Sequence, residues 1–203
     1  MSDLPPLLES GAQADPFAQF QLWFEQALSG GFVEPTAMAL ATADAAGRPS
    51  LRMVLLKGHD RRGFVFYTNY SSRKGEDLAG NPRAALLWWW DKQQRQVRVE
   101  GRVEKLSRAE SETYFHSRPR GAQLSALASP QSRVVTGRAQ LEARVRTLAN
   151  QYDGQDVPLP EDWGGYRLQA DTFEFWQGRR DRLHDRLRYR READVWRIER
   201  LGP

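Results

Sequence analysis

Short segments rich in aliphatic and aromatic residues, separated by glycine-rich or polar turns, make up most of this chain. Such segments are typical of antiparallel strands, because successive side chains of a strand point to opposite faces of the sheet. The turn residues at 45–47 and 60–63 predict tight hairpins between neighbouring strands. The predicted strands cover residues 36–43, 49–57, 63–69, 83–90, 94–106, 164–177, 182–190 and 194–200.

Three stretches show helical signals instead. Asp15 followed by Pro16 is a capping residue before a proline, which is typical of a helix start, and the helix is expected to end at Gly30. Ser107 and Glu110 have the spacing of a capping box and predict a helix over residues 107–117. A further apolar stripe predicts a helix over residues 138–152. Many strands with few helices favour a mainly β (α+β) class, a small β-barrel with peripheral helices.

Length and composition limit the possible classes of protein. The 203 residues fit a single domain, placed at residues 15–203, and residues 1–14 are expected to be disordered because they contain adjacent prolines and a Ser-Gly pair. No apolar run approaches the roughly 20 residues that cross a bilayer. No lysine or arginine precedes Arg48, so a secretory signal or transit peptide does not fit. The absence of cysteine excludes disulfides, and a cytoplasmic protein without a membrane partner is the simplest interpretation.

Charge is unevenly distributed along the chain. Residues 1–47 hold six acids and no lysine or arginine, whereas residues 48–203 hold all 30 bases and 20 acids. A basic body can indicate nucleic-acid binding, but these bases alternate with acids and no nucleic-acid motif is present. The dinucleotide and P-loop glycine patterns are absent, and three scattered histidines do not predict a metal site. Small anionic ligands are therefore favoured over nucleic acid.

The C-terminal region contains a cluster of cationic and proton-bearing groups. Arg182, His184 and Arg186 are spaced by two, so on the predicted strand they would share one face, beside Trp176. Arginine both stacks on rings and pairs with phosphate or carboxylate, so this cluster suits a planar anionic ligand. A solvated basic edge strand is the alternative, since Arg188 continues the same spacing.

A second cationic cluster lies near the start of a fourth predicted helix, a short one that follows the strand over residues 63–69 and ends near residue 81. Arg73 and Lys74 would lie in its first turn, where they oppose the helix dipole unless an anion binds there. Side chains that simply point into water are the alternative interpretation. Arg52 and Lys57 bracket a buried-type strand, and their odd spacing places them on opposite faces unless a bulge intervenes.

Together these motifs resemble the pyridoxine/pyridoxamine 5′-phosphate oxidase family over about residues 16–203. The resemblance implies a split β-barrel that binds flavin mononucleotide (FMN) and works as a homodimer with the flavins at the subunit interface. It implies oxidation of pyridoxine or pyridoxamine 5′-phosphate to pyridoxal 5′-phosphate, a step of vitamin B6 biosynthesis and salvage, with reduction of O2 to H2O2. The motifs that carry it are Arg52-Met53-Val54-Leu55-Leu56-Lys57, Phe66-Tyr67-Thr68-Asn69, Ser72-Arg73-Lys74, Arg95-Gln96-Val97, Tyr114-Phe115-His116-Ser117-Arg118-Pro119-Arg120, Gln131-Ser132, Trp163-Gly164-Gly165, Glu174-Phe175-Trp176-Gln177-Gly178 and Arg182-Leu183-His184-Asp185-Arg186.

The resemblance also implies roles for individual residues. Arg182 and His184 would lie over the substrate ring, and Lys57, Tyr114 and Arg118 would hold its phosphate. The FMN phosphate would be held by Arg52, Arg73 and Lys74 with help from Thr68. The remaining implied flavin contacts, some of them from the partner subunit, are Met53, Val54, Leu55, Leu56, Lys57, Tyr67, Gln96, Gln131, Ser132, Trp176 and Arg186.

The sequence departs from the family pattern in three places. Residues 1–14 lack the basic and aromatic stretch that can fold over the active site, and Ala122 replaces a common serine that would donate to a phosphate. The run from Trp88 to Trp90 is more aromatic than expected and is interpreted as barrel packing. Two alternatives stay open: a related split-barrel flavin oxidase acting on another ring of the phenazine type, and a non-catalytic carrier of flavin or pyridoxal phosphate.

Overall fold

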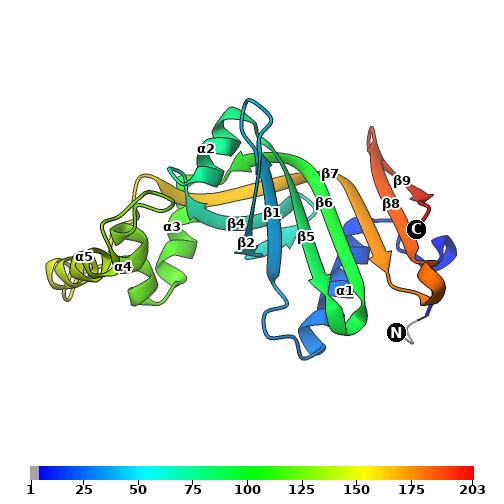
Figure 1. The fold of residues 1–203 in the computed structure, drawn as a ribbon, viewed down its shortest axis with the longest axis horizontal. Helices are drawn as coiled ribbons and strands as arrows, with labels where there is room; N and C mark the ends of the chain where they lie inside the picture. The colour runs from blue at the N-terminus through cyan, green and yellow to red at the C-terminus, as the bar shows by residue number, and fades with distance from the viewer. Residues whose placement is uncertain (1–4) are drawn as a thin grey trace.

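A strongly curled antiparallel sheet forms the body of the protein (Figure 1). The computed structural model describes residues 5–203. Within them the sheet has nine strands in the order β2-β1-β5-β6-β7-β4-β3, with β8 paired to β7 and β9 paired to β8. The strands are β1 (Ala37–Ala43), β2 (Pro49–Leu55), β3 (Gly58–Asp60), β4 (Gly63–Asn69), β5 (Arg83–Trp90), β6 (Arg95–Lys105), β7 (Trp163–Gln177), β8 (Asp185–Glu192) and β9 (Val195–Arg200).

Strand β7 is the longest and divides the sheet into two halves. One of its edges pairs with β6 along most of its length, but the other edge pairs with β4 over residues 163–168 and with β8 over residues 172–177. The β6–β7 register shifts at Gly101, where an added Cβ would lie 1.9 Å from the carbonyl oxygen of Gln169. A side chain is excluded there, and the resulting bulge increases the local twist of the sheet. The sheet therefore curls around a core instead of lying flat.

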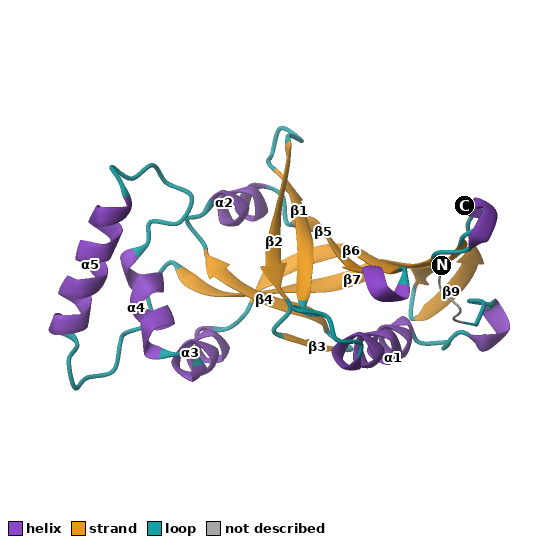
Figure 2. Ribbon diagram, turned by 60° about the horizontal axis from the view of Figure 1, so that its bottom comes forward, coloured by secondary structure: helices purple, strands orange, loops and turns teal. Residues whose placement is uncertain are grey.

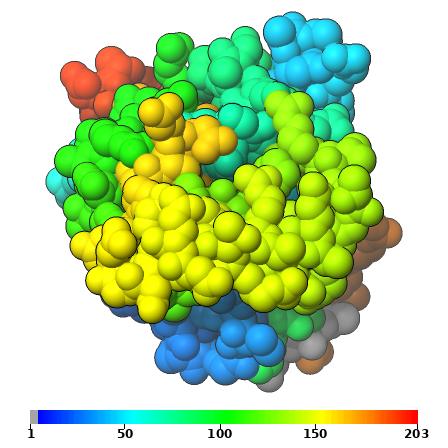
Figure 3. Space-filling view, turned by 90° about the vertical axis from the view of Figure 1, so that its left-hand side faces the viewer, coloured from blue at the N-terminus to red at the C-terminus, as the bar shows by residue number. Residues whose placement is uncertain are grey.

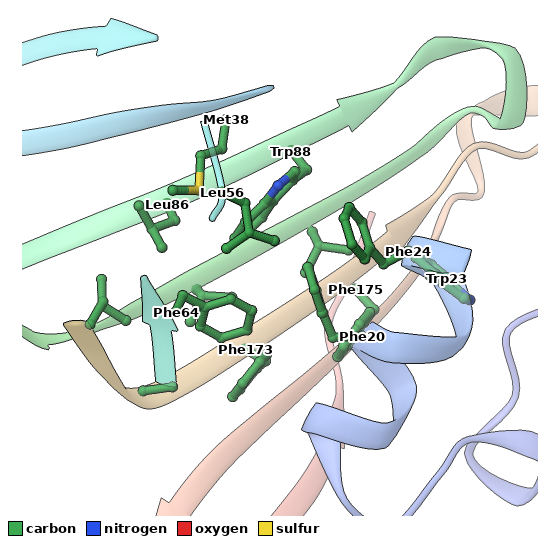
Figure 4. Packing of buried hydrophobic residues seen from close by; sticks show 14 of the residues in the cluster. Phe20, Trp23, Phe24, Met38, Leu56, Phe64, Leu86, Trp88, Phe173 and Phe175 are labelled. Atoms are coloured by element: carbon green, nitrogen blue, oxygen red, sulfur yellow. The ribbon is translucent and has the colours of Figure 1, made fainter. Parts of the chain in front are cut away.

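The main core lies between the sheet and helix α1 (Pro16–Ser29). The Asp15 side chain accepts a hydrogen bond from the Phe17 N–H at the start of this helix, and Pro16 occupies its first turn. The periodicity of the helix directs Phe20 and Phe24 onto the aromatic side chains of the sheet (Figure 4). The residues drawn there include Phe64, Trp88, Phe173 and Phe175.

Four more helices lie at the opposite half of the sheet, and three of them form a cap (Figure 2). These are α2 (Arg73–Gly80), α3 (Arg108–Ser117), α4 (Arg120–Ala128) and α5 (Arg138–Gln151). Phe115, Leu124 and Trp163 belong to a second, smaller core under α3, α4 and α5. Helix α5 forms the outer surface of this end, where its atoms are yellow in Figure 3, and it has no fully buried residue. No helix within residues 5–203 is long and apolar enough to cross a membrane.

The predicted class, mainly β with peripheral helices, is confirmed, and most predicted strands match within two residues. The capping box of Ser107 and Glu110 is also confirmed, with the Ser107 side chain accepting from the Glu110 N–H. Strand β3 and helix α4 were not predicted. Strand β3 has only three residues, and α4 follows Arg118 and Pro119 without a clear apolar stripe.

Two expectations need correction. The strand predicted from residue 182 begins at Asp185, because Asp181 and Arg182 have positive φ angles of 55° and 60° and belong to a short 3-10 turn. The expected disorder of residues 1–14 is wrong for residues 5–14, while residues 1–4 lie outside the described part. Leu7 is buried and its N–H donates to Asp185, and Glu9 pairs with Arg200 at 2.8 Å. Contacts with the distant C-terminal strands, which composition alone does not show, hold this segment in place.

Candidate active site

A polar cavity of about 340 Å3 lies where β2 and β4 meet α2, α3 and the segment after α4. Its volume lies in the range of small-molecule sites. Residues of the C-terminal halves of β2 and β4 both line this cavity, and α2 follows β4 directly and adds Lys74. The lining residues are Arg52, Met53, Val54, Leu55, Lys57, Tyr67, Thr68, Lys74, Tyr114, Arg118, Gln131 and Trp163.

Lys74 brings a buried ammonium group to one wall of this cavity. Only 8% of the residue is exposed, and its Nζ donates to the oxygens of Thr68 (3.0 Å), Gln131 (2.9 Å) and Ser72 (3.2 Å). All three acceptors are neutral, and within residues 5–203 Lys74 forms no ion pair with a carboxylate. Burial, with the nearby charge of Arg52 adding to it, lowers the pKa of Lys74 to about 8. A buried cation without a counter-charge is costly, so this group is prepared to receive an anion.

Arg52 lies beside Lys74, and residues of β1 and α2 hold its side chain in place. Its guanidinium donates to the Leu40 carbonyl oxygen (3.0 Å) and to the Thr42 hydroxyl (2.7 Å), and it lies 3.7 Å from the carboxylate of Asp77. Partial burial lowers the pKa of Arg52, the charge of Asp77 opposes that shift, and the charge of Arg73 adds to it. Arg73 is exposed and does not line the cavity, but it is close enough to add positive potential at the same wall.

Arg118 supplies a third cation, from the turn between α3 and α4. Its guanidinium lies 4.8 Å from the ring centre of Trp163, and burial lowers its pKa. One of its nitrogens, Nη1, is buried without a hydrogen-bond partner among the described residues. An unsatisfied buried donor of this kind is costly and therefore points to a ligand oxygen.

Aromatic rings and a second hollow complete the region around Arg118. The rings of Tyr67 and Tyr114 stack with centres 3.8 Å apart, and Trp163 lies parallel to both. Lys57, Tyr67 and Tyr114 also line an adjoining hollow of about 490 Å3, so the polar cavity continues into a second space. Two adjacent spaces that share Lys57 can hold two anionic ring compounds.

The other predicted residues lie on the half of the sheet formed by β6, β7 and β8. Gln96 is the cross-strand neighbour of Trp176, and Trp176 is the neighbour of Arg186. His184 lies against Trp176, with ring centres 4.6 Å apart, and its Nδ1 accepts from the Arg179 N–H. None of these side chains lines the polar cavity.

Structure and sequence prediction differ at several of these positions. Arg182 and His184 lie in the turn before β8, so their spacing of two does not come from strand alternation. Lys57 and Arg52 reach the same cavity because β2 ends at Leu55 and alternation does not extend to residue 57. The Leu56 side chain points into the main core, so only its backbone can face a ligand. Ser132 is exposed next to Gln131 and has a φ of 67°.

Residues missed by sequence reasoning also shape the site. Trp163 lines the cavity and supports Arg118, although only its place before two glycines marked it in the sequence. Asp77 accepts a hydrogen bond from the Thr42 hydroxyl at 2.6 Å, and so holds in place the hydroxyl that accepts from Arg52. No local pattern identifies that contact, because 35 residues separate the two. A larger hollow of about 500 Å3 between α4 and α5 includes one charged residue, Arg144, and is a weaker candidate.

Solved structures share this architecture. PhzG from Burkholderia lata 383, solved with tetrahydrophenazine-1-carboxylic acid, has a TM-score of 0.94 and 32% identity and covers 100% of this chain and 99% of its own. A pyridoxamine 5′-phosphate oxidase-related, FMN-binding protein from Nostoc punctiforme has a TM-score of 0.74 and 17% identity. The match covers 94% of this chain and 98% of the Nostoc chain, and at this identity it shows the fold alone. The predicted split barrel is confirmed, and the cavity cations Lys74 and Arg118, which have no acidic partner among residues 5–203, fit a phosphorylated flavin. The protein is of the FMN-binding split-barrel class.

Sequence comparisons narrow this class to a family. The model of the family described as pyridoxamine 5′-phosphate oxidase matches residues 24–152, and the pyridoxine 5′-phosphate oxidase C-terminal dimerisation region matches residues 163–203. A pyridoxine/pyridoxamine 5′-phosphate oxidase of Bordetella petrii is 58% identical over 198 residues, 97% of this chain and 93% of its own. The protein of the same name from Gloeothece citriformis is 55% identical over 201 residues, which cover 98% of this chain and 94% of its own. The chain belongs to the pyridoxine/pyridoxamine 5′-phosphate oxidase family, and FMN is its cofactor.

Proposed function

We propose that the protein is a pyridoxal 5′-phosphate synthase, an FMN-dependent oxidase acting on pyridoxine 5′-phosphate and pyridoxamine 5′-phosphate. The alcohol and O2 give pyridoxal 5′-phosphate and H2O2; the amine, O2 and water give the same products and ammonia. The observation that carries this proposal is a pair of cations in one polar cavity, the buried Lys74 and the half-buried Arg118, that have no acidic partner among the described residues. Cations in two adjoining spaces suit two phosphorylated rings.

The wall near α2 is the proposed place of the FMN phosphate. Lys74 and Arg52 would bind its oxygens, with Arg73 adding positive potential and Thr68 a hydroxyl. The short helix α2 begins at the same place, so its free N–H groups and dipole favour the same charge. The backbone of residues 53–56 would lie along the flavin, with Tyr67, Gln131 and Ser132 as further contacts.

The opposite wall is the proposed place of the substrate phosphate. Arg118 has a free donor there, and Lys57 and Tyr114 lie where the two hollows join. A dianionic phosphate satisfies the orphaned Nη1 and neutralises two cations at once. Ala122 lines the neighbouring space and cannot donate, so these three groups would hold the phosphate without the serine common in the family.

We further propose that the active site is completed in a homodimer. Gln96, Trp176, Arg182, His184 and Arg186 lie away from the polar cavity of their own chain. Most of this second set belongs to residues 163–203, the part that matches the dimerisation region. A partner subunit would bring its own copy of the set over the cavity, with Arg182 and His184 above the substrate ring and Gln96, Trp176 and Arg186 at the flavin.

Bound FMN supplies the oxidising chemistry, and the residues supply binding and orientation. The described site contains no nucleophile activated by a base, which suits a reaction without a covalent enzyme intermediate. Holding two rings face to face is an orientation problem, and correct positioning can lower a barrier by about 7–11 kcal/mol. The planar guanidinium of Arg182 suits this positioning better than an ammonium would.

A related oxidase of phenazine type is the second candidate, favoured by the structural similarity to PhzG. A carboxylated tricyclic ring is also a planar anion. The orphaned Arg118 nitrogen together with Lys57 supports a phosphate instead, because two cations match a dianion better than a single carboxylate. The higher identity to proteins named pyridoxine/pyridoxamine 5′-phosphate oxidase supports the same choice.

The test is turnover by the FMN-loaded protein in air. Pyridoxine 5′-phosphate should give pyridoxal 5′-phosphate and H2O2 in equal amounts, and unphosphorylated pyridoxine should react far more slowly because it leaves Arg118 unsatisfied. Tight FMN binding without peroxide would support the carrier alternative. Oxidation of a tetrahydrophenazine carboxylic acid, but not of the vitamin phosphates, would support the phenazine-type oxidase.

A further inference from the structure

The three consecutive tryptophans of β5 do not share one role. Trp88 and Trp90 are 0% and 2% exposed and belong to the main core, which agrees with the packing role expected from the sequence. Trp89 is 51% exposed and points to the opposite face of the sheet, as strand alternation requires. The expectation of barrel packing is therefore wrong for Trp89, and its large ring needs another explanation.

Trp89 ends a row of four side chains that crosses four strands on one face. Trp89 of β5 is paired across the strands with Gln96 of β6, and Gln96 is paired with Trp176 of β7. Trp176 is paired in turn with Arg186 of β8. Directly paired residues of antiparallel strands lie on the same face. The indole rings of Trp89 and Trp176 are in contact, with centres 5.9 Å apart and planes at 59°.

Within residues 5–203, contacts such as that with Trp176 leave about half of Trp89 uncovered. Two residues further along the same face, the next row contains Arg98 and Glu174, which pair with each other at 2.7 Å. A charged pair is a poor apolar partner for an indole. A single exposed tryptophan is ordinary on a protein surface, but one that touches Trp176 in this row extends an aromatic surface that is already present.

We infer that Trp89 is a further binding residue for the flavin ring system, extending the surface formed by Gln96, Trp176 and Arg186. This inference rests on the proposed function, in which those three residues face the flavin. A planar tricyclic ring has more apolar area than the Trp176 indole alone can cover. Trp89 would enlarge that contact and hold the flavin more tightly than a small residue at the same position.

The experiment is FMN titration of the apoprotein, followed by quenching of flavin fluorescence. Trp89→Ala should raise the dissociation constant of FMN about three- to tenfold, which is the change in affinity expected from losing one aromatic contact. Trp89→Phe should raise the dissociation constant less, because phenylalanine keeps an aromatic ring at this position. Trp196→Phe is the matched control: this ring packs on Phe173 on the core face, and its replacement should leave FMN affinity within about twofold.

Trp176→Ala separates failure of this inference from failure of the proposed function. If Trp176→Ala weakens FMN binding and Trp89→Ala does not, the inference is overturned and the proposed flavin face stands. If neither variant changes FMN affinity, the proposed flavin face is itself wrong, and Trp89 falls with it. Sedimentation of the apoprotein covers the remaining case: a Trp89→Ala protein that dimerises more weakly with unchanged FMN affinity would make Trp89 a subunit contact and overturn the inference.

Discussion

Two regions of this molecule are rich in arginine and lysine, and their cations have different surroundings. In the polar cavity, Lys74 is buried and Arg118 is half-buried, and neither pairs with a carboxylate among residues 5–203; the carboxylate of Asp77 lies 3.7 Å from Arg52. On the C-terminal half of the sheet, several cations are paired with carboxylates. Glu174 accepts from both Arg98 and Arg186, and Arg188 pairs with Glu199 at 2.6 Å.

This contrast shows that a ligand site differs from a structural region less in its number of cations than in whether those cations are paired with carboxylates. A cation that already has a carboxylate gains little from a phosphate, whereas a desolvated cation without one gains a full charge-assisted hydrogen bond. By sequence alone the C-terminal arginines were the more conspicuous cluster. By their surroundings, the cavity cations are the stronger anion site.

The largest expected effect is at Arg118. Arg118→Gln should lower kcat/KM for pyridoxine 5′-phosphate about 100-fold or more, since truncating one partner of a buried charge pair costs about 2–5 kcal/mol. FMN affinity should change less than threefold, because the other wall is the proposed place of the FMN phosphate. Arg188→Gln, which removes a paired cation, should leave kcat/KM within about twofold. Equal losses of substrate turnover and FMN binding in Arg118→Gln would contradict the assignment of the two walls.

Lys74→Met should have the next largest effect. The dissociation constant of FMN should rise about 30-fold, which corresponds to about 2 kcal/mol, through loss of the phosphate contact. The thermal midpoint of the apoprotein should not fall, because the substitution removes a buried cation that has no counter-charge. Lys105→Met, at an exposed lysine, is the control. A destabilised apoprotein with normal FMN affinity would make Lys74 a structural residue.

Glu174 tests the scaffold side of the comparison. This residue is 2% exposed and accepts hydrogen bonds from two arginines. Glu174→Gln should therefore lower the free energy of unfolding by about 1–3 kcal/mol. The loss is smaller than for breaking a fully buried ion pair, because both arginines are partly exposed to solvent. Urea denaturation of the apoprotein measures it. Glu192→Gln, at an exposed pair, should cost less than about 0.5 kcal/mol. Similar small losses in both variants would show that the paired cations do not hold this half of the sheet together.

FMN affinity should also depend on pH. The pKa of Lys74 is lowered from 10.5 to about 8 in the apoprotein, so its ammonium is lost as the pH rises above 8, and a bound phosphate would oppose that loss. The dissociation constant should therefore rise by up to about tenfold per pH unit above 8. By the same linkage, the apoprotein gains stability between pH 8 and 10.5, because there the unfolded chain binds the proton that the folded chain has released. Riboflavin, without a phosphate, should show no such decrease in affinity; an equal pH dependence for both ligands would rule out Lys74 as the cause.

The regular elements could be predicted from sequence because their signals are local. Strand β5 matches its predicted range, residues 83–90, and Ser107 caps α3 as its spacing with Glu110 requires. Arg182 and His184 show the limit of such reasoning. A spacing of two fits a strand, but the positive φ angles of Asp181 and Arg182 place them in a turn that the pattern does not reveal.

The site was predictable in its residues and not in its electrostatics. The resemblance named Lys74 and Arg118, but their lack of acidic partners depends on which distant side chains fold next to them. Asp77 reaches Thr42 and Arg52 only through the packing of α2 on β1 and β2, and Leu7 reaches Asp185 across almost the whole chain. Long-range contacts of this kind leave no periodic trace in the sequence.

The most direct test is a crystal structure of the FMN-loaded protein. It should show the phosphate oxygens of FMN within hydrogen-bond distance of Lys74 Nζ and of the Arg52 guanidinium, at the wall where Thr68 and Gln131 now accept from Lys74. A phosphate bound instead among the paired arginines of β8 and β9, with Lys74 still held only by its neutral acceptors, would contradict the central claim.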